Sequence, residues 1–219
     1  MFDLEKAQRM SLTLQVEARL KSALIVGALK PGARLVTKDI AEQLGTSITP
    51  VREALLRLVS SGALDATPAQ AFLVPEISLS RYHEIITIRK SLEVMAVTEA
   101  VRYMDEEKLT RLHQLYDEFR AAKLSANVER ALQANRAFRF QLYDYAGMPT
   151  LCVLIEQLWV RIGPCFNYLY PQSEAAAQGH HNYDDLLEGL AQKDEKRCVK
   201  AILKSIDDGA TILMNQYFG

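Results

Sequence analysis

Three polar side chains with the chemistry to bind DNA lie close together between Ser47 and Arg52. A guanidinium such as that of Arg52 can hold a guanine edge through two hydrogen bonds, or it can pair with a phosphate. The hydroxyls of Ser47 and Thr49 are groups that bind phosphate and set the register of a protein on a duplex. The segment therefore predicts contacts with double-stranded DNA, provided that a helix presents these side chains together.

The neighbouring residues predict that helix and the turn before it. A first helix is expected to begin at Thr37, and its apolar residues are spaced to face one core, namely Ile40, Ala41 and Leu44. Gly45 suits the left-handed backbone of a tight turn. Ser47 can cap a second helix, and Pro50 fits its first turn, where the missing N–H does no harm. Apolar residues continue this helix at Val51, Ala54, Leu55 and Leu58.

A helix, a turn and a helix in this order form a helix-turn-helix, whose second helix enters the major groove by its N-terminal end. The residues expected near DNA are Lys38, Ser47, Ile48, Thr49, Pro50 and Arg52, whereas Arg57 lies farther along and is a weaker candidate. Two short strands are predicted at 63–66 and 72–74, and the segment between them, with Gln70, would form a wing. The alternative is an ordinary helical hairpin, but the strand pair and the Gly27–Gly32 segment favour DNA binding.

This region resembles the GntR family of bacterial transcription regulators. The family pattern runs G-x-L-x-P-G-x-x-L and then L-A-x-x-L-G-V-S-R-x-P-V-R-E-A-L-x-x-L. The chain follows it from Gly27 to Leu35 and from Ala41 to Leu58 at most positions. It departs at Ile48, where the family usually has an Arg that reads a base, and it lacks the usual glycine at the wing tip. The resemblance implies operator binding, and the departures leave the operator sequence open.

Composition sets wider bounds. The chain has 219 residues, of which 49% are hydrophobic, and a net charge of −1. Residues 1–78 hold nine Lys and Arg against eight Asp and Glu, so affinity for DNA in general should be modest and sensitive to salt. We find no signal peptide and no long apolar span, so a cytoplasmic protein without a membrane partner is expected. The three cysteines, Cys152, Cys165 and Cys198, lack metal-site spacing and are expected to be reduced and buried.

The expected fold is mainly α, with a winged helix-turn-helix at 1–77 and an all-helical bundle at 78–219. Helical spacing recurs over 80–103, 106–124, 127–146, 148–169, 180–192 and 194–217. No phosphate-binding loop, nucleophile elbow or paired-carboxylate motif is present, so an enzyme and a cofactor are not expected. The bundle is expected to dimerise, because a homodimer matches a pseudo-palindromic operator.

The bundle resembles the helical effector domain of the FadR branch, through the segment from Ile88 to Glu93 and that from Asn135 to Leu151. The spacing around Met95, Trp159 and Tyr217 is also similar to that of enterobacterial colanic-acid and biofilm regulators. Many domains of this branch hold a divalent metal with one Asp and three His. The resemblance places those ligands at Asn135, Arg139, Tyr183 and Ser205, so all four are replaced and no metal is expected there.

The same four positions should face one cavity. Arg139 would place a fixed positive charge where the metal stood, and Arg89 is expected to add a donor. We expect a site for a small anionic effector, such as a carboxylate, with Arg139 as the clamp. The alternative is that Arg139 pairs with Glu93 and the cavity is closed, which would leave a regulator that binds DNA constitutively. His180 and His181, with Asp184, form a separate candidate metal cluster.

Overall fold

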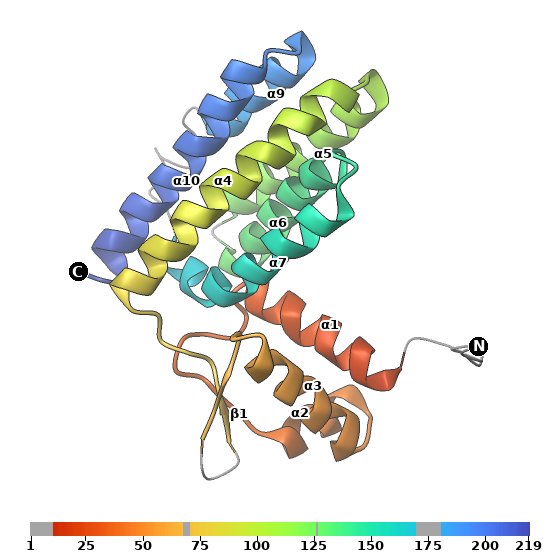
Figure 1. Ribbon diagram of the computed structural model, residues 1–219, viewed down its shortest axis with the longest axis vertical. Helices are drawn as coiled ribbons and strands as arrows, with labels where there is room; N and C mark the ends of the chain where they lie inside the picture. Colours follow the sequence, from red (N-terminus) through yellow and green to blue (C-terminus); the bar gives the residue numbers. More distant parts are fainter. Residues whose placement is uncertain (1–10, 68–70, 126, 170–180) are drawn as a thin grey trace, which may run out of the picture.

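A winged head and an elongated helical bundle make up the computed structural model, which describes residues 11–67, 71–125, 127–169 and 181–219. The head lies at one end of the bundle, and α1 runs along the junction between the two parts (Figure 1). The mainly α fold predicted from the sequence is confirmed. Among the described residues, no helix combines the length and the apolarity needed to cross a bilayer.

Three helices form the core of the head: α1 (Leu12–Ile25), α2 (Thr37–Leu44) and α3 (Ile48–Ser60). As predicted, α2 begins at Thr37 and ends at Gly45, whose φ of 62° lies in the left-handed region. Ser47 occupies the N-cap position of α3, but its side chain makes no capping hydrogen bond, which corrects the expected cap. The Ser47 side chain is instead exposed to solvent.

A small antiparallel sheet completes the head in the order β1-β3-β2. Its strands are β1 (Arg34–Leu35), β2 (Asp65–Ala66) and β3 (Phe72–Leu73). The predicted strand pair corresponds to β2 and β3, whereas β1 was not predicted, because two residues are too few to show an alternating pattern. At the base of the wing, the Thr67 hydroxyl donates to the Ala71 carbonyl over 3.2 Å. Gln70, which was expected to lie in the wing, is outside the described residues.

Long helices build the bundle, and side-chain caps start several of them. The elements are α4 (Leu79–Tyr103), α5 (Glu106–Leu124), α6 (Val128–Asp144), α7 (Pro149–Ile162), the 3-10 segment η1 (Gly163–Leu169), α9 (Asn182–Gln192) and α10 (Glu195–Gln216). The single helix expected over 148–169 is wrong, since α7 ends at Ile162 and η1 follows. Pro164 explains the break, because it has no N–H to donate and its ring collides with the preceding turn.

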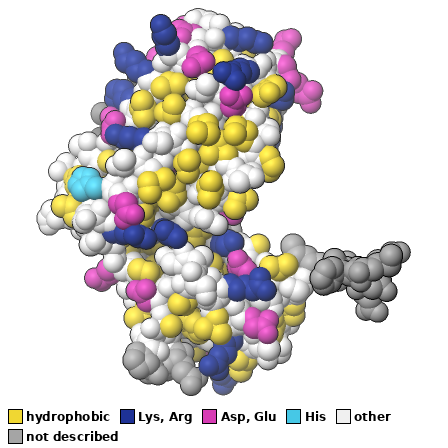
Figure 2. Space-filling view, viewed as in Figure 1, with side chains coloured by type: hydrophobic (Ala, Val, Ile, Leu, Met, Phe, Trp, Pro, Cys, Tyr) yellow, Lys and Arg dark blue, Asp and Glu magenta, His cyan; other side chains and the backbone are white. Residues whose placement is uncertain are grey.

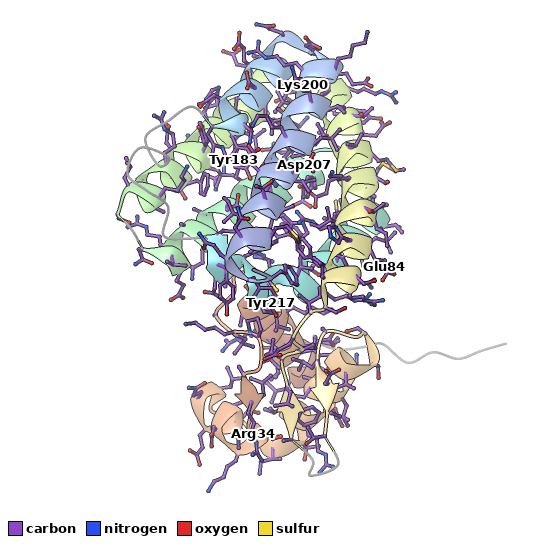
Figure 3. The ribbon with its side chains drawn as sticks, turned by 90° about the vertical axis from the view of Figure 1, so that its left-hand side faces the viewer. Arg34, Glu84, Tyr183, Lys200, Asp207 and Tyr217 are labelled. Carbon is purple, nitrogen blue, oxygen red and sulfur yellow. The ribbon has the colours of Figure 1, made fainter. Side chains whose placement is uncertain are left out.

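Contacts at one end of the bundle hold the head. Gly163 lies so close to α1 that an added Cβ would stand 2.3 Å from the Leu24 carbonyl oxygen. The Asn167 amide donates to the Gly27 carbonyl, and Arg161 donates to the Ser61 carbonyl over 2.7 Å. Figure 3 shows Tyr217 at this end of the bundle, where its hydroxyl accepts from the backbone N–H of Ile77 over 3.3 Å. The end of α7, the segment η1 and the residue after α10 therefore all contact the head or the segment that leads from it.

Candidate DNA-binding face and bundle cavity

The N-terminal end of α3 presents the predicted DNA-binding side chains to solvent. Ser47, Ile48, Thr49 and Arg52 are exposed, and Pro50 is half-buried. Ile48 is 52% exposed, although it is apolar and its helix packs on the core of the head. Arg52 has no ion-pair partner among the described residues, so its guanidinium is free to bind an external anion. The face has the geometry of a recognition helix entering a groove.

Two further basic residues of the head are exposed on other elements. Lys38 of α2 is exposed and lies 3.9 Å from Glu42, in a solvated pair that contributes little to stability. Arg34 of β1 is exposed and pairs in register with Leu73, beside the wing. Figure 3 shows Arg34 in the lower part of the head. Sequence reasoning missed Arg34, because one basic residue in a two-residue strand gives no periodic signal.

A cavity of about 500 Å³ opens inside the bundle, between α10 and the helices that face it. All five residues predicted to bind an effector line this cavity, namely Arg89, Asn135, Arg139, Tyr183 and Ser205. They come from α4, α6, α9 and α10, which are far apart in the sequence. The cavity also has lining residues that were not predicted, among them Lys123, Trp159, His181 and Gly209.

Glu93 lies beneath the cavity and ties its two arginines together. It is fully buried, and its Oε1 accepts from Arg89 Nε over 2.6 Å and from Trp159 Nε1 over 2.9 Å. Its Oε2 accepts from the Tyr143 hydroxyl over 2.5 Å and lies 3.5 Å from Arg139 Nη2. Burial alone would raise the pKa of Glu93, but Arg89 and Arg139 outweigh it and hold that pKa below its usual value.

The two alternatives for Arg139 therefore both describe part of the structure. Its pairing with Glu93 forms, yet the cavity stays open. The Glu93 carboxylate faces the guanidiniums of both arginines, and both residues are buried: Arg89 is 4% exposed and Arg139 is 3% exposed. The Nε and Nη1 atoms of Arg139 are buried and have no hydrogen-bond partner among the described residues. An unsatisfied buried donor is costly, and no described residue supplies the acceptor that these two atoms lack.

Polar side chains surround Arg139 on the side away from the head. The Tyr183 hydroxyl donates to Asn135 Oδ1 over 2.5 Å, and Ser205 is hydrogen-bonded to Tyr183. Lys123 is 8% exposed and lines the same region; burial, reinforced by Arg120, lowers its pKa. This part of the cavity carries positive charge and hydrogen-bond donors.

His181 has a structural role beside the cavity. Its Nδ1 accepts from the backbone N–H of Tyr183 over 3.2 Å, and its backbone N–H donates to Asp184 Oδ2. His181 and Asp184 thereby form a capping box at the start of α9. Burial, with Lys123, lowers the pKa of His181 to about 3, so the ring is neutral near pH 7. His180 lies outside the described residues. In the part of the chain that the structure describes, no three His, Cys, Asp or Glu side chains gather as metal ligands.

The cavity residues do not fit the divalent metal found in many domains of the FadR branch. Asn135, Tyr183 and Ser205 offer neutral oxygens in place of carboxylate and imidazole ligands, and Arg139 brings a positive charge into the same space. Transition-metal sites need several deprotonated ligands that converge on one point. The donor set at these positions suits an anion and repels a cation.

Comparison with known proteins agrees with this architecture. Residues 12–74 match the family model of the bacterial regulatory proteins of the gntR family, and residues 84–208 match the FCD domain. The chain is 48% identical over 214 residues to the HTH-type transcriptional regulator McbR of Escherichia coli strain K12, and the match covers 97% of both chains. The chain belongs to the GntR family. This GntR protein is a DNA-binding transcriptional regulator with an FCD effector domain, as the sequence resemblance implied.

Two further comparisons bear on its fold and kind. The solved structure of E. coli McbR/YncC has a TM-score of 0.89 to this GntR protein at 48% identity, with 95% of this chain and 100% of that chain covered. The Nta operon transcriptional regulator of Aminobacter aminovorans is 26% identical over 178 residues, which are 81% of this chain and 82% of the relative. Both comparisons extend over the head and the bundle together.

Proposed function

We propose that this regulator acts in the cytoplasm as a homodimer on a pseudo-palindromic operator, under the control of a small anionic effector and without a metal or other cofactor. The head, taken as residues 1–77, contacts DNA through Lys38, Ser47, Ile48, Thr49, Pro50, Arg52 and Gln70. The bundle, taken as residues 78–219, binds the effector and the second copy. The observation that carries the effector proposal is the buried Arg139, which lines an open cavity and whose Nε and Nη1 find no acceptor among the described residues.

A carboxylate satisfies that cavity better than water does. The Arg89 and Arg139 guanidiniums share only Glu93 as a buried counter-charge, so their immediate surroundings retain one excess positive charge. A carboxylate would neutralise this charge and accept hydrogen bonds from Arg139. Hydrogen bonds between charged partners are about twice as strong as those between neutral ones. Asn135 and Ser205 would orient the bound acid.

The alternative function is a regulator that has lost its effector and binds DNA constitutively. That alternative requires side chains to fill the space left by the family's metal site. The cavity of about 500 Å³ falls in the range of small-molecule sites, and Arg139 lines it. We therefore favour control by an effector.

We propose that a second copy covers an apolar face formed by α4 and α7. Figure 2 shows hydrophobic side chains gathered over these two helices, and the large exposed ones include Ile88 at 41%, Met95 at 47% and Val153 at 52%. Ile88 and Met95 are seven residues apart and share one face of α4. Replacing Met95→Lys should convert the dimer into a monomer in sedimentation equilibrium. Leu124→Lys, an exposed apolar position at the end of α5, should leave the dimer intact; equal effects would contradict this interface.

Effector binding can reach the head through η1. Phe166 and Leu169 line the cavity, whereas Gly163 and Asn167 of the same segment contact α1 and the turn after it. An effector can shift the heads only through a difference in affinity between their two arrangements. We propose that contacts with η1 supply that difference.

The DNA-binding role of α3 is tested with duplexes enriched from a random library by the wild-type protein. Arg52→Ala should weaken their binding by at least about fivefold, because a lost guanine contact costs about 1–3 kcal/mol. Arg57→Ala is the control, since Arg57 lies farther along α3 and is 3.7 Å from Glu17. Equal affinities of the two variants would contradict the proposed orientation of α3.

The effector role of Arg139 is tested by isothermal titration calorimetry with a panel of organic acids. Arg139→Met should weaken binding of the acids that the wild type binds by at least about tenfold, the lower part of the range for a hydrogen bond to a charged group. Arg136→Met, on the same helix, is the control, because Arg136 does not line the cavity and lies 3.8 Å from Glu156. Binding of acids to both variants with wild-type affinity would contradict the site.

A further inference from the structure

The cavity has two chemically different ends along α10. Toward the start of the helix the lining is mainly polar, with Lys204, Ser205 and Asp208 beside Ile206. Toward the end it is mainly apolar, with Gly209, Ala210, Ile212 and Leu213 before Gln216. Ser205 and Leu213 are eight residues apart, which corresponds to about 12 Å along a helix axis. Figure 3 shows Tyr183, which bonds Ser205, in the upper half of the bundle, and Tyr217 at the end beside the head. The polar end therefore lies away from the head and the apolar end next to it.

Aromatic rings separate the two ends and fix the positions of the arginines. The Arg139 guanidinium carbon lies 5.6 Å from the ring centre of Tyr183 and 5.8 Å from that of Trp159. The Arg89 guanidinium carbon lies 4.8 Å from Trp159 and 5.7 Å from Phe166. Arg139 thus stands at the border of the polar end, and Trp159 and Phe166 begin the apolar end.

Gly209 leaves the wall of the apolar end without a side chain. This residue lies inside α10, where glycine is less favourable than alanine by about 0.5–1 kcal/mol. Its φ is not positive, and among the described residues an added Cβ would meet only Leu169, at 3.9 Å. The missing side chain leaves free space between α10 and η1. A large side chain at this position would enter the cavity from its wall.

We infer that the effector is an amphipathic monocarboxylate, with its carboxylate at Arg139 and an aromatic or medium-length aliphatic body against Gly209, Phe166 and Leu169. This inference rests on the proposed anionic effector and adds the class of acid. A short or highly hydrophilic acid fills only the polar end and leaves the apolar end to water. An apolar body excludes that water and contacts η1, the segment that holds the head.

The test compares four acids and one neutral amide by isothermal titration calorimetry on the full-length protein. Octanoate and 3-phenylpropanoate should bind at least tenfold more tightly than acetate and citrate. The neutral 3-phenylpropanamide has the same apolar body, and it should bind at least tenfold more weakly than its acid. Gly209→Leu should weaken the two amphipathic acids at least tenfold and leave any acetate binding unchanged.

Gly209→Ala is the matched control, because its Cβ fits at van der Waals distance and removes little of the space. It should be more stable than the wild type and should still bind 3-phenylpropanoate within a few-fold. Citrate or acetate binding more tightly than 3-phenylpropanoate would overturn the amphipathic class and leave the Arg139 site standing. Equal binding of the amide and the acid would overturn the anionic effector itself. Absence of binding by every probe to the wild type would overturn both proposals.

Discussion

Replacing Glu93 by glutamine should remove much of the stability of the bundle. Each Glu93 oxygen faces two donors: Arg89 and Trp159 at Oε1, and Tyr143 and Arg139 at Oε2. A glutamine side chain accepts on one oxygen only, so in either orientation two donors lose their acceptor. Each buried donor left unsatisfied costs about 1–3 kcal/mol, and removal of one partner of a buried ion pair costs about 3–5 kcal/mol. We expect Glu93→Gln to lower the free energy of unfolding by about 3–5 kcal/mol.

Urea unfolding, followed by far-ultraviolet circular dichroism near neutral pH, measures this loss. The control is Glu99→Gln on the same helix, because Glu99 pairs with Arg102 at 2.7 Å while the Arg102 side chain is 61% exposed. A solvated pair of this kind contributes about 0–1 kcal/mol. If Glu93→Gln cost no more than the control, the network beneath the cavity would not hold the arginines as described.

The same carboxylate sets a pH dependence. The pKa of Glu93 is lower in the folded protein than in the unfolded chain, where a glutamate titrates near pH 4.3. Its contribution is therefore complete above that pH and is lost as the pH falls through the folded pKa. The difference in stability between the wild type and Glu93→Gln should shrink in acid. A difference that stayed constant down to strongly acidic pH would contradict the ionised state of Glu93.

Three further results are expected. Gly163→Ala should lower the free energy of unfolding by about 1–3 kcal/mol or more, because its Cβ would stand 2.3 Å from a carbonyl oxygen of α1. Gly45→Ala is the control: it makes no such contact and should cost about 1–2 kcal/mol through its positive φ alone. Burial lowers the pKa of His181 to about 3, so the fold should lose stability as the pH falls from about 6.5. In urea titrations, His181→Gln should reduce this loss of stability, whereas the exposed His113→Gln should not. Burial raises the pKa of the Cys165 thiol to about 12, so it should react with a disulfide reagent only on unfolding, and rapid labelling of the native protein would contradict this.

Local signals in the sequence carried the prediction of the head. Gly45 and Pro50 act through their own backbone preferences, so the turn and the start of α3 could be placed without tertiary information. The strand β1 was not predicted, because its two residues are defined by pairing with β3 rather than by a pattern of their own. The break at Pro164 carried a local signal as well, but apolar spacing across it favoured one continuous helix.

The cavity could be predicted only in part. The resemblance to the FadR branch indicated four positions that share a site, and helical spacing put Asn135 and Arg139 on one face. The sequence could not show that Glu93 pairs with Arg139 while the cavity stays open, because that outcome depends on how four helices pack. Lys123 and Gly209 were missed for the same reason, since nothing in the neighbouring sequence marks them as lining residues.

The central claim is that Arg139 in the bundle controls DNA binding by the head. Fluorescence anisotropy of an enriched operator duplex tests it most directly, with 3-phenylpropanoate added at a concentration that saturates the cavity. Without acid, the wild type and Arg139→Met should bind the duplex equally. With acid, the operator Kd of the wild type should change by at least about fivefold, the lower end of allosteric coupling, and that of Arg139→Met should not change. An equal response of both proteins, or no response of the wild type to bound acid, would contradict control through this cavity.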